Sequence, residues 1–279
     1  MSRIAVIGIA GKSVFLTVDG FGKTGETTVA KDIHEELGGK GFNQAVAAAR
    51  WGAEVSFLAA VNESDVFPFT EIAKERGVKA FFAAKKEKSP YAVITTDKNG
   101  DNRVCVYRGA ELSADDVSSF KEEIIAADIL LINNEVPEKV NETAVAVAKE
   151  HGVKVILNPA PSRKYRKDFL DKIDLFTPNE HETEGLDGYE NIVLTLGAKG
   201  CMIKSTGEIV PAAKVEKVAD TTGAGDTFNG VLAACLSGGE SLKEALKNAN
   251  AAAAVKVGRK YVLDSIPTKR EVGSFDREK

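Results

Sequence analysis

The sequence predicts a doubly wound α/β fold, in which a mostly parallel sheet is flanked by helices. Short, continuously apolar runs such as ADILLIN and VKVILNP alternate with alanine-rich stretches of helical spacing. This alternation is typical of parallel strands that are buried on both faces. The predicted helices end at glycine, at Gly52, Gly77 and Gly152. In such sheets ligands bind beyond the carboxyl ends of the strands.

The predicted elements follow one another along the whole chain. Strands are expected in RIAVIGI, EVSFLAAV, ADILLIN, VKVILNP, KIDLFTPN and NIVLTLG, and helices in FNQAVAAARWG, FPFTEIAKERG and KVNETAVAVAKEHG. Two segments, at about 12–37 and 89–109, break the alternation because they are strand-like with turns. The second predicts a hairpin that turns at Asn99-Gly100 or Gly100-Asp101. We interpret both segments as strands of a small β-sheet lid inserted into a single domain, 1–279.

The composition argues against several classes of protein. The 279 residues are 43% hydrophobic and 28% charged, as in ordinary globular domains, and the formal net charge is −4. That charge argues against nucleic acid as a partner, and no apolar run approaches the ~18 residues of a membrane span. Cys105, Cys201 and Cys235 are few, odd in number and far apart. They predict small buried thiols in a reducing, cytoplasmic compartment.

Two glycine motifs near the N-terminus match nucleotide-binding signatures only in part. GIAGKS, residues 8–13, ends like a P-loop, but Val6 stands where that loop needs a glycine. GFGKTG, residues 20–25, matches a dinucleotide-binding pattern, but no helical pattern follows its third glycine. Neither segment predicts a nucleotide site, and the second is better explained as a turn.

The segment DTTGAGDTFNG, residues 220–230, carries the strongest chemical signal. Gly223, Ala224 and Gly225 precede a run of helical spacing, so we expect them at a helix N-terminus, where free N–H groups favour an anion. Asp226 lies beside them and makes sense as a base that takes a proton from a hydroxyl during phosphoryl transfer. From this segment alone, a helix N-cap at Asp226 or Thr227 is an equally good interpretation.

Two further polar clusters would complete a site. In LGGKGFNQAVAAARWGA, residues 37–53, glycines open another alanine-rich helix, and Lys40 and Asn43 offer hydrogen-bond donors. In FTPNEHETE, residues 176–184, Asn179 and Glu182 share a face if the stretch is one helical turn. This amide and carboxylate could hold a hydrated Mg²⁺ near a phosphate. Taken alone, the stretch is better explained as a solvated acidic turn.

Together these segments resemble the ribokinase-like (PfkB) family of ATP-dependent sugar kinases. The resemblance runs along nearly the whole chain, and the residues of its motifs are most similar to the ribokinase branch of the family. It is carried, in the family's order, by GGKGFNQAVAAARWGA, NPAPS, TPNEHETE, TLGAKG and DTTGAGDTFNG. It implies transfer of the γ-phosphoryl group of ATP to a hydroxyl of a small sugar or polyol, with Mg²⁺ and potassium as cofactors. It also implies a homodimer formed through the lid.

The resemblance implies a role for each matching residue. Asp226 is the expected base, and Gly223, Ala224 and Gly225 form the expected anion hole. The other substrate contacts are expected at Ser13, Gly39, Lys40, Asn43 and Glu135. The nucleotide is expected to contact Asn179, Thr195, Gly197, Gly225 and Asn250. Magnesium would be organised indirectly by Asn179 and Glu182, and a monovalent cation would bind at Asp220, Thr222 and Ser265.

Three positions depart from the ribokinase pattern. Ribokinases place an asparagine and an aspartate after the first strand to grip sugar hydroxyls, whereas this sequence has Gly11 and Ser13. Losing the carboxylate should cost about 1.5–3 kcal/mol of ribose binding, because serine is a weaker anchor. Tyr261 stands where ribokinases have a glycine in the cation-site loop. The sequence therefore predicts a sugar kinase but does not identify the sugar.

Two alternatives to a kinase of simple sugars stay open. One is a kinase of a nucleoside or of a phosphosugar on the same fold, for which Lys12 and Arg108 are the candidate contacts to a substrate phosphate. The other is a sugar- or nucleotide-binding protein without catalytic activity. Its expected mark would be a lost Asp226 or a broken Gly223-Ala224-Gly225, and both are intact.

Overall fold

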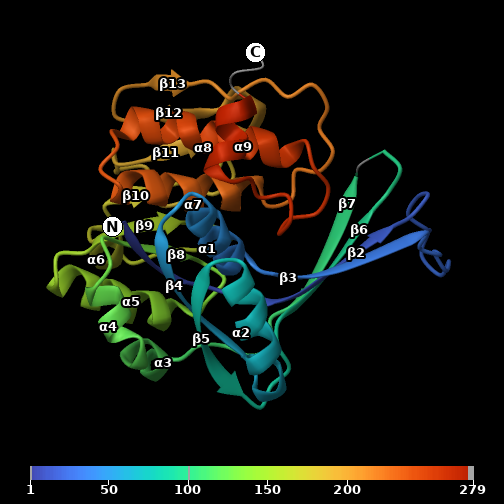
Figure 1. Cartoon of the computed structure of the whole chain (residues 1–279), viewed down its shortest axis with the longest axis horizontal. Helices are drawn as coiled ribbons and strands as arrows, with labels where there is room; N and C mark the ends of the chain where they lie inside the picture. The colour runs from blue at the N-terminus through green and yellow to red at the C-terminus, as the bar shows by residue number, and fades with distance from the viewer. Residues whose placement is uncertain (1, 100, 276–279) are drawn as a thin grey trace.

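A parallel six-stranded sheet forms the centre of the molecule (Figure 1), in a computed structural model that describes residues 2–99 and 101–275. The strand order is β10-β9-β8-β1-β4-β5, and all the pairings are parallel. The strands are β1 (Arg3–Ile7), β4 (Glu54–Asn62), β5 (Val78–Lys85), β8 (Ile129–Asn133), β9 (Lys154–Asn158) and β10 (Leu175–Phe176). The predicted doubly wound fold is confirmed.

Helices cover both faces of this sheet and bury a separate hydrophobic core on each. Ile4 and Val6 of β1 face one core, and Ala5 and Ile7 face the other, because successive side chains of a strand point to opposite faces. The first face is covered by α1 (Lys40–Arg50), α2 (Val66–Glu75, preceded by the 3₁₀ turn Glu63–Asp65), α7 (Ala224–Ser237), α8 (Leu242–Val257) and α9 (Lys269–Phe275). The second is covered by α3 (Ala114–Ser119), α4 (Lys121–Ile125), α5 (Glu138–Glu150) and α6 (Lys167–Leu170).

Most predicted helix boundaries agree with the structure. Gly52, Gly77 and Gly152 follow α1, α2 and α5 with φ of 100°, 76° and 75°, the left-handed conformation in which glycine ends a helix. At the N-terminus of α7 the boundary differs from the prediction. The helix begins at Ala224, ahead of the apolar run, so Asp226 lies inside its first turn.

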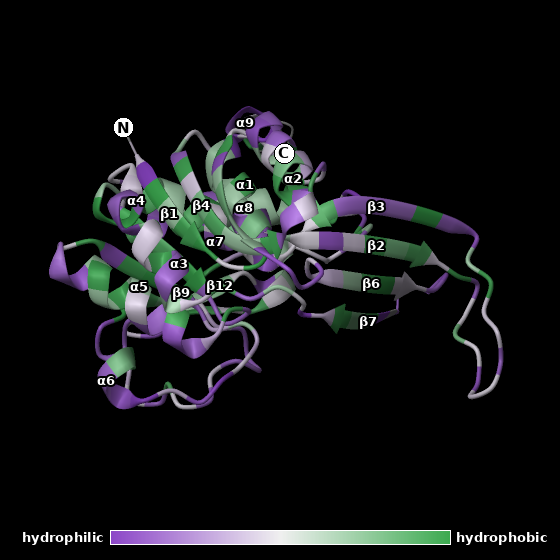
Figure 2. Ribbon diagram, turned by 90° about the horizontal axis from the view of Figure 1, so that it is seen from below, coloured by the Kyte–Doolittle hydropathy of each residue, from purple (hydrophilic) through white to green (hydrophobic). Residues whose placement is uncertain are grey.

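A second sheet projects from the body of the molecule, and we call it the outer sheet (Figures 1 and 2). It has the order β3-β2-β6-β7 and consists of β2 (Gly11–Thr17), β3 (Asp32–Gly38), β6 (Tyr91–Thr96) and β7 (Asn102–Tyr107). β6 and β7 form the predicted antiparallel hairpin, whereas β2 and β6 are parallel. Gly100, which belonged to both predicted turns, lies outside the described residues. GFGKTG lies in the loop between β2 and β3, as expected of a turn.

The segment NIVLTLG was predicted to be a strand of the central sheet, but it belongs to a separate sheet. Its strand β11 (Val193–Thr195) pairs antiparallel with β12 (Cys201–Ile203), which pairs with β13 (Glu208–Val210). Among the described residues, the third sheet is joined to the end of β10 by single parallel bridges, Phe176 to Ile192 and Asn179 to Thr195. β10 stops just before Pro178, which has no N–H to continue a ladder.

The three cysteines are free thiols, but they are not all buried. Cys201 and Cys235 are buried as predicted. Cys105 is exposed because it lies in β7, the edge strand of the outer sheet, so the prediction of a buried thiol was wrong there. Within the described ranges, the structure has no helix long and apolar enough to cross a membrane.

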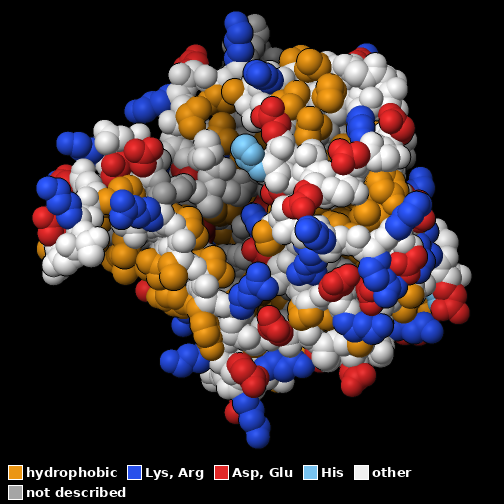
Figure 3. All heavy atoms as spheres, turned by 180° about the vertical axis from the view of Figure 1, so that it is seen from behind, with side chains coloured by type: hydrophobic (Ala, Val, Ile, Leu, Met, Phe, Trp, Pro, Cys, Tyr) orange, Lys and Arg blue, Asp and Glu red, His pale blue; other side chains and the backbone are white. Residues whose placement is uncertain are grey.

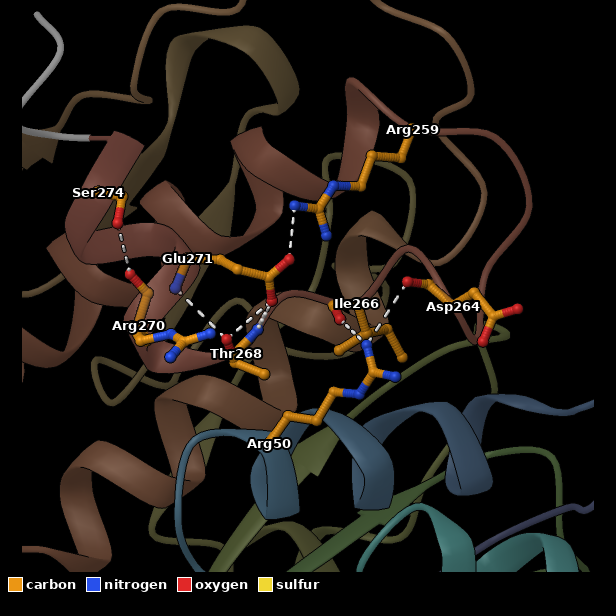
Figure 4. A network of polar contacts seen from close by, with 8 residues as sticks. All are labelled: Arg50, Arg259, Asp264, Ile266, Thr268, Arg270, Glu271 and Ser274. Atoms are coloured by element: carbon orange, nitrogen blue, oxygen red, sulfur yellow. Dashed lines mark hydrogen bonds and ion pairs between the residues drawn. The ribbon is translucent and has the colours of Figure 1, made fainter.

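The loop between α8 and α9, residues 258–268, is fixed from both sides (Figure 4). Arg50, the last residue of α1, donates hydrogen bonds to the carbonyl oxygens of Asp264 and Ile266. α9 begins with a capping box. The Glu271 carboxylate accepts from the N–H of Thr268 at 2.8 Å, and the Thr268 hydroxyl accepts from the N–H of Glu271 at 3.3 Å. These contacts hold the loop against α1, beside the site described next.

Candidate active site

Polar side chains meet where three central strands end. Asn133 and Asn158 are the last residues of β8 and β9 and lie opposite each other in the register. Thr177 follows β10, and all three side chains are buried. The N-terminal turns of α1 and α7 reach the same place, since Gln44 of α1 donates to Asn158 Oδ1 at 3.2 Å. The candidate site therefore lies at the carboxyl edge of the sheet, as expected for this fold.

Asp226 is held in this site by two amides of α1. Asn43 Nδ2 donates to Asp226 Oδ2 at 2.9 Å, and Gln44 Nε2 donates to Oδ1 at 3.3 Å. Asp226 is only 6% exposed, so both helices must approach closely. Gly230 permits that approach, because a Cβ there would lie 2.3 Å from the carbonyl oxygen of Gln44. The carboxylate is thus fixed in position while still reaching the site.

The residues just before Asp226 present backbone N–H groups. Gly223 has φ of 76°, a left-handed conformation that suits glycine, and it caps α7. Within the described chain, the N–H groups of Gly223, Gly225 and Asp226 have no partner. The N–H of Ala224, which was also expected in the anion hole, donates to Thr221 O at 3.2 Å. Three unpartnered N–H groups at a helix N-terminus can bind an anion.

Lys40 and Glu135 bring opposite charges to the same site. Glu135 follows β8, and its Oε2 accepts a hydrogen bond from the backbone N–H of Lys40 at 2.9 Å. Asp226, followed by Glu135 and Glu182, raises the pKa of the Lys40 ammonium against the effect of its burial. Burial raises the pKa of Glu135 to about 7, although Lys40 and Arg108 act to lower it. Lys40 therefore lies among three carboxylates, and Glu135 titrates near neutral pH.

Several buried polar atoms of the site have no partner. Among the described residues, these are Asn43 Oδ1, Gln44 Oε1 and Asn133 Nδ2. Buried polar atoms are normally hydrogen-bonded, so unpartnered ones beside a carboxylate point to a bound polar molecule. A small pocket lined by Gly8, Ile9 and Glu135 lies at the ends of β1 and β8. Acceptors and donors are thus both available to a molecule with hydroxyl groups.

The base of the outer sheet adjoins the N-terminus of α1. β3 leads through Gly39, with φ of 102°, directly into α1, and Ser13 is buried against Gly38. Gly11 cannot carry a side chain, because a Cβ there would lie 2.1 Å from the carbonyl oxygen of Pro90. The space-filling view shows a hollow between the outer sheet and the body, with hydrophobic side chains gathered on the sheet (Figure 3).

Asn179 and Glu182 form a turn and not the helical turn that we had considered. The N–H of Glu182 donates to Asn179 O at 3.1 Å, and Glu182 Oε2 accepts from the N–H of Asn179 at 3.0 Å. Asn179 Oδ1 accepts from the N–H of His181 at 2.8 Å. The turn replaces a helix because Asn179 bridges to Thr195 of the third sheet, which requires extended backbone. Glu182 Oε1 has no partner in the described chain.

The remaining predicted nucleotide contacts lie around the third sheet. Thr195 Oγ1 donates to Pro178 O at 3.2 Å, and Gly197 has φ of 56° in the turn that follows β11. Asn250 of α8 is buried, and its amide donates to the carbonyl oxygens of Val210 at 2.9 Å and Pro211 at 3.2 Å. Asn250 therefore fastens the end of β13 to α8.

The residues expected to bind a monovalent cation are engaged by the chain itself. Asp220 Oδ1 accepts from the N–H of Thr222 at 2.9 Å, and Oδ2 accepts from the N–H of Tyr261 at 3.1 Å. The carbonyl oxygen of Asp220 accepts from Lys256 Nζ at 2.8 Å. The Ser265 hydroxyl donates to the Lys260 carbonyl. Tyr261 adopts φ of 63°, the left-handed conformation that favours glycine.

Four residues of the site had been given no role in the sequence analysis. Hydrogen bonds link Asp226 to the strand ends and back to α7 through four side chains, those of Gln44, Asn158, Thr177 and Asn229. Thr177 Oγ1 donates to Asn229 Oδ1 at 2.5 Å, and Asn229 Nδ2 donates to Gly225 O at 2.9 Å. Their sequence signal was an amide or hydroxyl residue at the end of each apolar strand and one turn into each glycine-opened helix.

A doubly wound sheet with a buried carboxylate beside a free helix N-terminus fits one class of protein, a phosphotransferase that acts on hydroxyl groups. Residues 1–269 match the family described as pfkB family carbohydrate kinase. The chain belongs to this family, and it is a carbohydrate kinase. The predicted family, fold and enzyme class are therefore confirmed.

Individual relatives agree with this assignment. The ribokinase of Haemophilus influenzae is 34% identical over 98% of this chain and 97% of its own. The crystal structure of ribokinase from Thermotoga maritima is 30% identical, with a TM-score of 0.87, and 99% of this chain and all of that chain are covered. Arabidopsis thaliana ribokinase, solved with ribose and ATP, is 27% identical with a TM-score of 0.84, and the match covers 98% of each chain.

Proposed function

We propose that this kinase transfers the γ-phosphoryl group of ATP to a hydroxyl of a small sugar, with Asp226 as the general base. One observation carries the proposal. The buried Asp226 carboxylate, held by Asn43 and Gln44, lies beside the unpartnered N–H groups of Gly223 and Gly225. A base and an anion site are thereby adjacent, which is what the transfer of a phosphoryl group to a hydroxyl requires.

The proposed step uses these groups in a fixed order. The sugar hydroxyl gives its proton to Asp226 while its oxygen forms a bond to the γ-phosphorus. The bond between that phosphorus and the β–γ bridging oxygen breaks, and ADP leaves with the electron pair. The N–H groups of Gly223, Gly225 and Asp226 neutralise charge on the transferring group. The N–H of Ala224 does not take part in this anion hole, because it donates to the carbonyl oxygen of Thr221.

Sugar binding is assigned to the polar groups around Lys40. Glu135 and Asn43 Oδ1 can accept hydrogen bonds from sugar hydroxyls, Lys40 can donate, and Gly39 lets the chain turn closely beside them. Ser13 offers a hydroxyl from the base of the outer sheet. Ribose is the first sugar to test, because the relatives are named ribokinases. Gly11 and Ser13 supply no carboxylate, so the affinity for ribose should lie below that of a protein with a carboxylate anchor at this place.

ATP and magnesium complete the proposal. The nucleotide would lie along Asn179, Thr195, Gly197 and Asn250, with its γ-phosphate at Gly225. The residues present fit a hydrated Mg²⁺, because Glu182 Oε1 is an unpartnered carboxylate oxygen at a half-buried position. When bound, magnesium supplies neutralisation of phosphate charge. Glu182, together with the amide of Asn179, would orient its water ligands.

Potassium was also implied by the resemblance, through Asp220, Thr222 and Ser265. The carbonyl and both carboxylate oxygens of Asp220 already accept hydrogen bonds, one of them from the charged Lys256. A second cation at this place would be repelled by that ammonium. These residues fit potassium poorly, so no step of the proposed reaction uses it.

We assign the outer sheet the role of a lid within a single domain, and we extend the proposal to a homodimer formed through it. Its strands carry exposed hydrophobic side chains, namely Ile33, Tyr91, Val104, Val106 and Tyr107. Exposed apolar patches commonly mark association surfaces. Light scattering after size-exclusion chromatography tests this part, and a monomer at all concentrations contradicts it. A cytoplasmic location, consistent with three free thiols, belongs to the proposal as well.

The experiment that tests the proposed function combines a substrate panel with one variant. ADP release is measured with ribose, other pentoses, hexoses, polyols and nucleosides. Asp226→Asn should lower kcat by at least ~10²-fold on the best substrate, while ADP binding and the unfolding temperature stay unchanged. Asp187→Asn, an exposed aspartate in a turn, is the matched control. If the Asp226→Asn variant had the kcat of the native enzyme, Asp226 would not be the general base.

A further inference from the structure

Lys256 is a buried lysine beside the proposed anion hole. It lies near the end of α8 and is 0% exposed. Lysine is almost never fully buried unless it is paired, because removing an ammonium from water is costly. In the surrounding stretch, NANAAAAVKVG, the other buried residues are small and apolar except for Asn250. A charged residue at this helix position therefore needs a specific partner.

That partner is the segment that leads into the anion hole. Lys256 Nζ donates to the carbonyl oxygen of Asp220 at 2.8 Å. Burial is the largest influence and lowers the pKa of Lys256, although the charges of Asp220, Glu36 and Asp226 act to raise it. These negative charges offset part of the cost of burying the ammonium. The ammonium thus compensates negative charge that would otherwise be buried beside the phosphoryl-transfer site.

Asp220 connects Lys256 to two loops, the one that leads into α7 and the one between α8 and α9. Its carboxylate accepts from the N–H groups of Thr222 and Tyr261, one on each loop. Glu36 of the outer sheet accepts from the N–H groups of Val262 and Leu263 at 3.0 Å each. The ring of His34 stacks on Tyr261 with centroids 3.8 Å apart. Lys256 is therefore the positive centre of a network that joins the outer sheet to residues 220–223.

We propose that Lys256 Nζ is a built-in cation, which positions the anion-hole loop through Asp220 and makes catalysis independent of added monovalent cations. The inference rests on the proposed function, since Lys256 acts through the anion hole. A tethered ammonium is always present at its site, so no ion has to be bound from solution. Lys256 is a positioning residue, because it contacts Asp220 and not the reacting groups.

The first test uses the native enzyme. Activity is compared in potassium, sodium and tetramethylammonium chloride at equal ionic strength, because tetramethylammonium is too large to enter a site of this kind. We expect the three rates to agree within about three-fold, since the cation is supplied by the chain. Activation by potassium beyond that factor overturns the proposal. This comparison needs no variant, so it decides the question even if substitutions prevent folding.

The second test removes the ammonium. In tetramethylammonium, Lys256→Ala should lower kcat about 10-fold or more, the scale of a lost hydrogen bond to a charged group, with the KM for sugar little changed. The small alanine leaves space, so potassium or ammonium ions should restore part of the rate. Lys256→Met fills the space without charge and should be slow in every salt. A Lys256→Met variant with the native kcat overturns the proposal.

A third readout separates this inference from the proposed function. Unfolding temperatures of native protein and Lys256→Ala are measured in the same salts without sugar. Potassium should raise the unfolding temperature of the variant relative to tetramethylammonium and should leave that of the native protein unchanged. A potassium-specific rise for the native protein contradicts a built-in cation. If no sugar on the panel is phosphorylated, the proposed function fails, while this measurement still tests Lys256.

Discussion

The amide nitrogen of Asn43 lies 2.9 Å from a carboxylate oxygen of Asp226, although 183 positions separate the two residues. The contact joins the first turns of α1 and α7, two helices that each begin after a glycine with positive φ. The donor fixes the carboxylate and leaves Asn43 Oδ1 without a partner in the described chain. One side chain can therefore orient the proposed base and also accept a hydrogen bond from a sugar hydroxyl.

Replacing Asn43 by leucine should slow the enzyme without unfolding it. Leucine has a similar volume but cannot donate to Asp226, and a hydrogen bond to a charged group contributes about 1.5–3 kcal/mol. We expect kcat/KM to fall about 10- to 100-fold, measured by ADP release with the best sugar. Asn248→Leu, a partly buried amide of α8 that bonds to Glu240, is the matched control. Equal kinetics for the two variants would contradict the role of Asn43.

Sugar binding should depend on pH through Glu135. The pKa of its carboxyl is raised to about 7 by burial, so it loses its proton near neutral pH. A carboxylate accepts hydrogen bonds from hydroxyls more strongly than a carboxylic acid does, so the KM for sugar should fall as pH rises through about 7. Glu135→Gln should have a higher KM that varies little over this range. A native KM that is flat from about pH 6 to 8 would exclude this role.

The same group should change the pH dependence of stability. Glu135 has an ordinary pKa of 4.5 when unfolded and a pKa of about 7 when folded. Between these values the folded protein binds more protons than the unfolded chain, so the free energy of unfolding falls as pH rises through the window. In Glu135→Gln this contribution is absent. Thermal unfolding at about pH 5 and pH 7.5 should show a smaller decrease for the variant than for native protein.

Gly230→Ala should destabilise the contact between α1 and α7. A Cβ at this position would lie 2.3 Å from Gln44 O and 2.6 Å from Ala47 Cβ, so the helices would have to move apart. Overpacking of this kind costs about 1–3 kcal/mol. We expect a lower unfolding temperature and lower activity, because Asn43 and Gln44 would retreat from Asp226. Gly188→Ala, whose added Cβ meets nothing within 4 Å, is the control and should have little effect.

Thr268→Ala should loosen the loop that carries Tyr261. The substitution removes the hydroxyl of the capping box, a loss of about 1 kcal/mol. Hydrogen bonds to Thr268 lower the pKa of Glu271 to about 2, from an ordinary 4.5. Its stabilising contribution is therefore complete above about pH 4.5 and is lost as pH falls toward 2. In urea unfolding, the difference between native and variant protein should shrink at low pH, and a difference that is constant with pH would contradict this origin.

Local patterns in the sequence determined the class of fold and most of the elements. Continuous apolar runs predict buried parallel strands, and glycine ends helices because it adopts the left-handed conformation freely. Chemistry with a local signature was predictable for the same reason. Gly223, Gly225 and Asp226 lie in one short segment, so a helix N-terminus with an adjacent carboxylate could be predicted from the amino-acid sequence.

Tertiary structure decided which distant groups meet. Gln44, Asn158 and Thr177 join Asp226 only because β9 and β10 end beside α1. No local pattern records that register. The strand in NIVLTLG pairs antiparallel with β12 and does not join the central sheet. The residues of NIVLTLG do not specify which strand it will pair with.

The cation site shows the same division most clearly. The resemblance to ribokinases implied a monovalent-cation site at Asp220, Thr222 and Ser265. Lys256 stood 36 positions from Asp220 in an apolar helical run, and its spacing gave no reason to connect the two. Only the packing of α8 against the loop before α7 brings the ammonium to the Asp220 carbonyl. Charge compensation in a protein interior depends on distances through space, and a sequence records only distances along the chain.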